Sequence, residues 1–371
     1  MTVAGSLIGL TIALLPLFTK VAEHDAARLV KDNLLVILFA LFGAVLPMKV
    51  RRLSLIGYVA LAYGLFMLVY NQWHPLSIMV QYQSIYIASG LIFFLVFYEK
   101  HTKKDLNGIL NGMTAGCLIQ SLIVIASFFG INAYFNFIGL FVGGARAIGS
   151  FPSGIGSLGN TNLLAAYVSL TAISLFRRKW FLLLPLPIAA LIIANSMMGY
   201  ITFIAGAFYF LNQKQNILKK FLLYPFAVIS MVSVYFIGLN GMDSHRFKIW
   251  REILGNLDFN HFLFGKGPGW FYDHPIMSGR QMAIHEHNEF ISAFNVFGVI
   301  GIILAFLVLL PIALKKDRSA IFPAVCFASF FNAFGHFTLH QSTTAIIVIV
   351  SAAICLAEED KICHQHGTEA H

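Results

Sequence analysis

Apolar residues gather in long runs along this chain, and short polar stretches separate the runs. The runs are 15 to 26 residues long. In a lipid bilayer, a backbone of that length must satisfy its own hydrogen bonds and therefore forms a helix. The pattern predicts helices over residues 3–19, 34–48, 53–70, 77–98, 106–130, 160–176, 180–194, 197–211, 218–238, 288–313, 320–337 and 340–357. The short segments 180–194 and 197–211 could also be one segment broken at Asn195-Ser196.

Composition excludes a water-soluble domain. Of 371 residues, 58% are hydrophobic and 11% charged, with mean hydropathy +0.78, whereas soluble domains average about 45–50% apolar and about 25% charged residues. The first run has no basic residues before it, so we expect a retained helix rather than a signal peptide. The expected fold class is an all-α integral membrane protein with about twelve transmembrane helices, forming one polytopic domain over residues 1–371.

Basic residues indicate which connections face the cytoplasm. If the runs cross alternately, 16 of the 25 Lys and Arg residues fall on one side, and every connection on that side carries some of them. Cytoplasmic loops of membrane proteins carry this excess. We therefore expect both termini in the cytoplasm, including a tail over residues 358–371. The net charge of +9 is explained by topology and contact with membrane lipids, not by nucleic acid binding.

Two long connections fall on the external side, at 131–159 and 239–287. The first is glycine-rich, with the sequence GGARAIGSFPSGIGSLGN, and the second mixes histidine, basic and aromatic residues. The remaining connections are much shorter. We therefore expect function to reside in these two loops.

Three stretches carry a resemblance to a known family. The pair His287-Asn288 is followed by nine residues, Gly298, two residues and Gly301, and this pattern resembles a signature of the O-antigen ligase and O-antigen polymerase superfamily. The segment Arg246 to Phe271 resembles that family's Arg-x-x-x-Trp segment followed by a Gly-x-Gly-x-Gly turn. ARAIGSFPSGIGSLGNTNLLAAY resembles a third family segment. Together with FGHFTLHQSTTA near the end, these stretches span roughly residues 145–345 in the family's order.

The resemblance implies a GT-C-type membrane glycosyltransferase in the bacterial inner membrane, acting in lipopolysaccharide or other surface polysaccharide biosynthesis. Such an enzyme transfers a glycan from an undecaprenyl-diphosphate-linked donor to a hydroxyl of a glycan or lipid acceptor on the external face, without a cofactor. Many ligases of the family carry an arginine after a serine near the start of the eighth helix. The corresponding stretch here, Ala194 to Gly199, has none, which leaves polymerase open beside ligase and raises the question whether Arg146 replaces it.

The diphosphate of such a donor needs cationic partners. Arginine suits this task because its planar guanidinium binds phosphate oxygens in bidentate fashion and stays charged. Arg246 is the principal candidate, with Arg146, Lys248 and Arg251 as further substrate-binding candidates. Arg246 and Lys248 would converge on an extended loop but not on a helix. The alternative is a basic loop that lies on anionic head groups.

His287 is the candidate general base, because the unperturbed pKa of histidine, about 6.5, lies near working pH. The alternative is a histidine that caps the tenth helix. Its neighbours Asn288 and Glu289 are candidate substrate-binding residues. Asn160 and Asn162 are candidates too, although capping of the sixth helix explains them equally well.

A metal site and a transport function are the remaining alternatives. The string His285 to Glu289 is not His-Glu-x-x-His, and two histidines two positions apart are poor zinc ligands. We therefore expect metal-independent catalysis. A transporter or flippase for a polysaccharide precursor is the alternative function. Ion-coupled transporters usually hold ionisable residues inside their spans, and the predicted runs contain one acidic residue, Glu289, at the mouth of the tenth.

Overall fold

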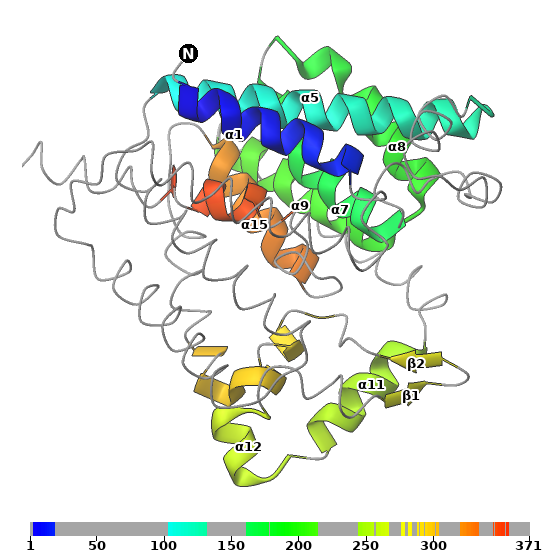
Figure 1. Cartoon of the computed structure of the whole chain (residues 1–371), viewed down its shortest axis with the longest axis vertical. Coiled ribbons are helices and arrows are strands. Elements are labelled where there is room, and N and C mark those ends of the chain that lie inside the picture. The colour runs from blue at the N-terminus through cyan, green and yellow to red at the C-terminus, as the bar shows by residue number, and fades with distance from the viewer. Residues whose placement is uncertain are drawn as a thin grey trace, which may run out of the picture.

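The computed structural model describes helices and one small hairpin. The described residues are 3–18, 103–131, 161–177, 179–213, 244–255, 257–266, 276–278, 281–283, 288, 290–292, 294–300, 302–303, 320–333, 344, 346–352 and 354–355. In Figure 1, α1, α5, α7, α8, α9 and α15 pack together, and α11, α12 and the hairpin lie at the opposite end. The predicted segments 34–48, 53–70, 77–98 and 218–238 lie outside the described residues.

The packed helices follow the apolar runs closely. Their bounds are α1 Val3–Leu14, extended by the 3-10 turn Leu15–Phe18; α5 Lys103–Phe128; α7 Thr161–Ala172, extended by Ile173–Phe176; α8 Pro185–Ala194, preceded by Phe181–Leu183; α9 Met197–Gln213; and α15 Ile321–Ala333. The helical character predicted for these runs is confirmed. Among the described residues, Leu106–Phe128 is long and apolar enough to cross a membrane, and four more apolar helical segments are shorter.

The helical path is broken between segments 180–194 and 197–211, at the expected position Asn195-Ser196, with α8 before the break and α9 after it. Asn195 ends α8 in the left-handed conformation, at φ 48° and ψ 46°. The next helix, α9, begins at Met197. A turn at Asn195-Ser196 therefore interrupts the helical path. Asparagine suits this turn because its short polar side chain tolerates the left-handed region.

Helix α7 occupies the centre of the bundle. Every residue from Leu164 to Ala172 is buried, and the helix contacts α5, α8, α9 and α15. Such a helix must be apolar all round. Its one large polar side chain, Tyr167, donates a 2.6 Å hydrogen bond from its hydroxyl to the carbonyl oxygen of Ile12 in α1.

Helices α1 and α5 are in backbone contact along a row of small residues. A Cβ on Gly9 would overlap the carbonyl of Gly108, and one on Gly112 would overlap the backbone of Gly9. The row consists of Gly5, Gly9 and Ala13 on α1 and of Gly108, Gly112 and Gly116 on α5, paired in ascending order. The two helices therefore run in the same direction, side by side in Figure 1. Four-residue spacing of small residues permits this close approach in membrane helices.

Large apolar side chains cover the outside of the same bundle. Leu182 before α8 is 86% exposed, and Leu10, Leu122, Phe128, Ile188 and Ile192 are also exposed. Polar side chains such as Gln120, Thr171 and Thr202 are buried instead. Water-soluble monomers rarely expose apolar surface on this scale.

The hairpin adds two strands to a chain predicted to be all-α. Strand β1, Ile276–Ser278, pairs antiparallel with β2, Gln281–Ala283, so that Ser278 lies opposite Gln281. The connection Gly279-Arg280 places glycine first in a two-residue loop, which favours a tight hairpin turn. Strands of three residues are too short for the alternation of apolar and polar residues to predict them from the sequence.

Candidate functional site

Helix α11, Ser244–Gly255, carries the Arg-x-x-x-Trp segment. At about 100° per residue, Arg246 and Lys248 are about 200° apart around the helix. Convergence of these two residues on an extended loop was therefore the wrong alternative. Their side chains lie outside the described residues, but the backbone fixes the face from which each one starts.

Two faces of α11 differ in burial. Ile249 and Ile253 are buried, and Arg246 precedes them by three and seven positions, which places it on the same face. Arg251 is exposed. The helix thus separates Arg246, on the packed face, from Arg251, on the open face. The substrate-binding roles expected for Lys248 and Arg251 stay predictions, with Arg251 on a different face of the helix from Arg246.

The packed face of α11 lies against the start of the predicted tenth span. Ile249 and Ile253 pack with Trp250 and with Ile291. Ile291 comes four residues after His287, so the structure brings the Arg-x-x-x-Trp segment next to the His-Asn segment. Nothing in the spacing of either motif alone predicted this contact.

Asn288 caps the tenth span. Its side-chain Oδ1 accepts hydrogen bonds from the backbone N–H groups of Phe290, at 2.9 Å, and Ile291, at 3.1 Å, and the residue is buried. This is the N-cap arrangement typical of asparagine. Asn288 therefore makes the N-cap that the alternative assigned to His287, and the substrate-binding role of Asn288 stays a prediction.

The Gly-x-Gly-x-Gly turn is joined to the same span by backbone contacts. Gly265, which ends α12 (Phe259–Phe264), has φ 76°, and Gly298 has φ 63°. A Cβ on Gly265 would overlap Val296 and Phe297, and one on Gly298 would overlap Leu263. We call this contact the glycine clasp, defined by Gly265 and Gly298. It unites two of the three stretches that carry the family resemblance.

Lys266 strengthens the glycine clasp and is a cation that sequence reasoning did not single out. Its backbone N–H donates a 2.6 Å hydrogen bond to the carbonyl oxygen of Asn295. Partial burial lowers the pKa of the Lys266 ammonium, while the negative charge of Asp258 acts in the opposite direction. Asp258 caps α12 by accepting from the backbone N–H of His261 at 2.7 Å. The position of Lys266 within the Gly-x-Gly-x-Gly turn is the feature of the sequence that could have identified it as a site residue.

Asn162 joins α7 to the α8–α9 turn. It is the second residue of α7, and its Oδ1 accepts a 2.8 Å hydrogen bond from the Ser196 hydroxyl. Capping therefore does not explain Asn162. Ser196 lies in the stretch where many ligases of the family that the sequence resembles carry an arginine, and the next residue, Met197, is half-buried. Five residues further along α9, the Thr202 hydroxyl donates to Asn332 Oδ1 of α15 at 3.2 Å.

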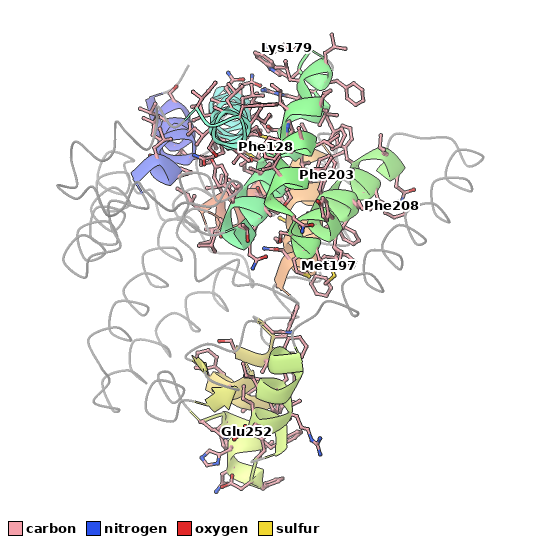
Figure 2. All side chains as sticks on the ribbon, turned by 90° about the vertical axis from the view of Figure 1, so that its right-hand side faces the viewer. Phe128, Lys179, Met197, Phe203, Phe208 and Glu252 are labelled. Atoms are coloured by element: carbon pink, nitrogen blue, oxygen red, sulfur yellow. The ribbon has the colours of Figure 1, made fainter. Side chains whose placement is uncertain are left out.

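The two ends of the bundle are distinct. Figure 2 shows Lys179 at one end of the green helices and Met197 at the other, with Glu252 of α11 beyond the Met197 end. The Asn162–Ser196 pair therefore lies at the end of the bundle that faces α11. Arg177, at the other end, donates from Nη2 to Asn111 Oδ1 at 3.0 Å on α5.

The remaining candidates are Arg146, Asn160, His287 and Glu289, and they lie outside the described residues. So do His285 and Glu286, and the expectation of metal-independent catalysis stays a prediction.

Comparisons with known proteins add no relative. No family model matches the chain, and neither a curated protein nor a solved structure does.

Proposed function

We propose that the chain is a membrane-embedded glycan transferase that uses a polyprenyl-diphosphate-linked donor at the external membrane surface. The observation that carries the proposal is the assembly of two separate sequence segments, residues 244–266 and 288–298, at one place. Helix α11 packs through Ile249 and Ile253 against Ile291, and the glycine clasp fixes the turn after α12 to the same span. Residue 287 is the position immediately before the Asn288 cap.

This arrangement gives the candidate residues separate tasks. Arg246 starts from the face of α11 that packs toward the tenth span, where a bidentate cation would neutralise the diphosphate as the sugar departs. His287 would accept the proton of the acceptor hydroxyl, which needs activation more than a diphosphate leaving group does. The exposed apolar side chains of α5 and α8 favour a lipid-embedded bundle.

Sidedness is consistent with the same proposal. Lys179, in a basic cluster assigned to the cytoplasm, lies at the end of the bundle away from α11 in Figure 2. Helix α11 belongs to the loop assigned to the external side. A polyprenyl-linked donor and a water-borne or lipid-borne acceptor would meet at that end.

A reconstituted assay tests the proposal. Purified protein in liposomes, given a polyprenyl-diphosphate oligosaccharide and an acceptor glycan, should release polyprenyl diphosphate and lengthen or modify the acceptor. A transporter or flippase would move the donor across the bilayer and leave its glycan attached. Gene deletion then separates the two transferase reactions: loss of all long chains with lipid-linked polymer retained indicates ligase, and one-repeat chains indicate polymerase.

A further inference from the structure

The external segment exposes a group of large apolar side chains that its own core does not use. Phe259 is 74% exposed and Phe264 is 59% exposed, and Leu254 and Phe262 are also open. They belong to α12 and to the end of α11. In water this surface would be unfavourable, because burying apolar area is the main stabilising term in folding and association.

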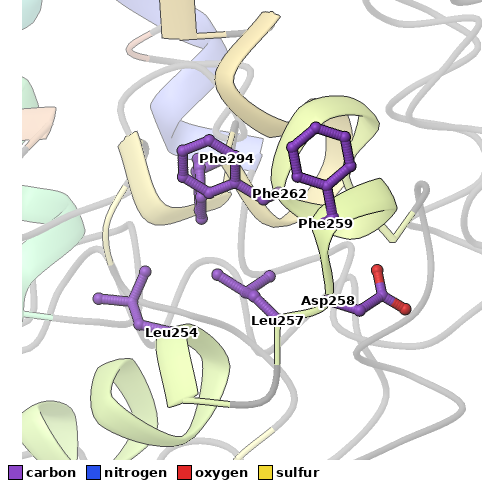
Figure 3. Close-up of a pocket in the computed structure, with 6 residues that line it drawn as sticks. All are labelled: Leu254, Leu257, Asp258, Phe259, Phe262 and Phe294. Atoms are coloured by element: carbon purple, nitrogen blue, oxygen red, sulfur yellow. The ribbon is translucent and has the colours of Figure 1, made fainter.

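A hollow of about 570 Å³ lies between these residues. Leu254, Leu257, Asp258, Phe259, Phe262 and Phe294 line it. Figure 3 shows two leucines on one side and three aromatic rings on the other, with the Asp258 carboxylate directed away from the leucines. The lining is thus apolar, and its one charge points outward.

The depth of α12 follows from the glycine clasp. Gly265 meets Val296 and Phe297 backbone to backbone, and Val296 is eight residues past the Asn288 cap. That is about 12 Å along a helix at 1.5 Å per residue, whereas one head-group layer is about 5–8 Å thick. If the tenth span enters the membrane at Asn288, α12 lies beside the part of the span that has already passed the head groups.

Neighbouring features agree with that depth. Beyond the clasp, Ile300 and Ile303 on the same span are exposed and apolar, so the apolar surface continues along the span. Residues 246 to 266 contain four basic and two acidic side chains, and exposed Arg251 lies one turn before Leu254. Aromatic and aliphatic side chains next to basic ones are typical of segments that lie in a membrane interface.

We propose that α12 and the end of α11 are inserted into the external leaflet, with Leu254, Phe259, Phe262 and Phe264 in contact with lipid acyl chains. The leaflet lipids, rather than a protein partner, cover the hollow. This inference rests on the external placement of the 239–287 loop and is independent of glycan transfer. It makes the loop a half-immersed structure whose exposed Arg251 lies at head-group level.

Spin labels measure the immersion directly. The variant Phe259→Cys, in a background with Cys363→Ser, is labelled with a nitroxide and placed in phospholipid nanodiscs as the full-length chain. The label should be accessible to oxygen, which concentrates among acyl chains, and shielded from a water-soluble nickel chelate. Cys117, Cys326 and Cys355 are buried, and the unsubstituted background sample reports any labelling of them.

Glu252→Cys is the matched control. Glu252 is exposed on the same helix end but about 160° around α11 from Leu254. Its label should show the opposite preference, for the nickel chelate. Phe264→Cys provides a second apolar position, and neither phenylalanine is part of a buried cluster, so folding should be retained.

Two outcomes would overturn the inference. A label at 259 or 264 that the nickel chelate reaches as easily as at 252 would mean that the face is in water. Shielding from both reagents, with an immobilised spectrum, would mean that protein covers the hollow, either a second copy or another segment of the chain. Failure of glycan transfer would leave these depth measurements unchanged.

Discussion

Gly265 and Gly298 meet backbone to backbone, each in a left-handed conformation and each without room for a Cβ. The contact binds the segment of α11 and α12 to the predicted tenth span at a point well beyond its cap. The proposed chemistry needs α11 and the start of that span at a fixed separation. The contact between Gly265 and Gly298 helps to hold that separation.

Replacing either glycine by alanine should loosen this joint. A left-handed alanine costs about 1–2 kcal/mol, and the added methyl group also forces the two backbones apart. We expect Gly265→Ala and Gly298→Ala to lower the temperature at which the segment of α11 and α12 becomes protease-sensitive, and to reduce transfer. Gly255→Ala is the control, since a Cβ there meets nothing within 4 Å. Equal behaviour of all three variants would contradict the clasp.

Arg246 and Arg251 should differ in their effect on donor binding. Loss of a charge-assisted hydrogen bond costs about 1.5–3 kcal/mol, so Arg246→Ala should weaken donor affinity about 10- to 150-fold. Arg246→Lys should restore part of this loss, because it returns the charge without the bidentate fork. Arg251→Ala should change affinity little, because Arg251 is on the open face of α11. Titration of a fluorescent donor in nanodiscs measures all three, and a larger effect at Arg251 would relocate the diphosphate site.

His287→Ala should reduce the single-turnover rate by about 10²- to 10⁴-fold, the usual contribution of a general base, with donor affinity nearly unchanged. Higher pH should recover part of the rate, because solvent then deprotonates more acceptor. Asn288→Ser is the neighbouring control, since serine also caps helices. Lost donor binding, or a rate close to that of the unsubstituted protein, would transfer the catalytic role to Glu289 or His285.

The row of small residues between α1 and α5 predicts that thermal stability falls steeply as the side chain at a glycine position of α5 becomes larger. Gly112→Leu should separate α1 from α5 and lower thermal stability in detergent by an amount typical of overpacking, about 1–3 kcal/mol or more. Leu122→Phe adds bulk to the same helix at an exposed position and should be tolerated. Thermal unfolding followed by thiol exposure of buried Cys117 distinguishes the two. Tolerance of Gly112→Leu would show that the helices do not approach as described.

Topology can be mapped with reporter fusions. Fusions at Arg178 and Lys316 should report the cytoplasm, and one at Lys266 the external side, because the basic clusters alternate in that way. A cytoplasmic signal at Lys266 would place the proposed site in the wrong compartment and remove the basis for an external transfer reaction.

Apolar periodicity was sufficient to locate helices but not to pair them. The run 106–130 predicted α5 (Lys103–Phe128) to within three residues at each end, since a bilayer-length apolar run has one way to satisfy its backbone. Pairing depends on local shape. The contact between Asn162 and Ser196 links positions 34 residues apart, and neither residue carries a signal for the other.

For the candidate site too, the sequence identified individual residues but not the contacts between them. Motif spacing identified the glycines at 265 and 298, but their contact requires two left-handed residues in different elements, which no spacing encodes. The basic residues of α11 were recognised as a group. Because the segment is a helix, that group is split between two faces, and only position 246 shares the face of Ile249 and Ile253.

The parallel course of α1 and α5 constrains a part of the chain far from the contact itself. Two parallel helices that both cross a bilayer enter it from the same side, so the chain between them must cross an odd number of times. Residues 19–102 contain three predicted crossings, which satisfies this parity, whereas two or four would not. A reporter series through residues 19–102 that finds an even number of crossings would therefore require that α1 or α5 does not span the membrane.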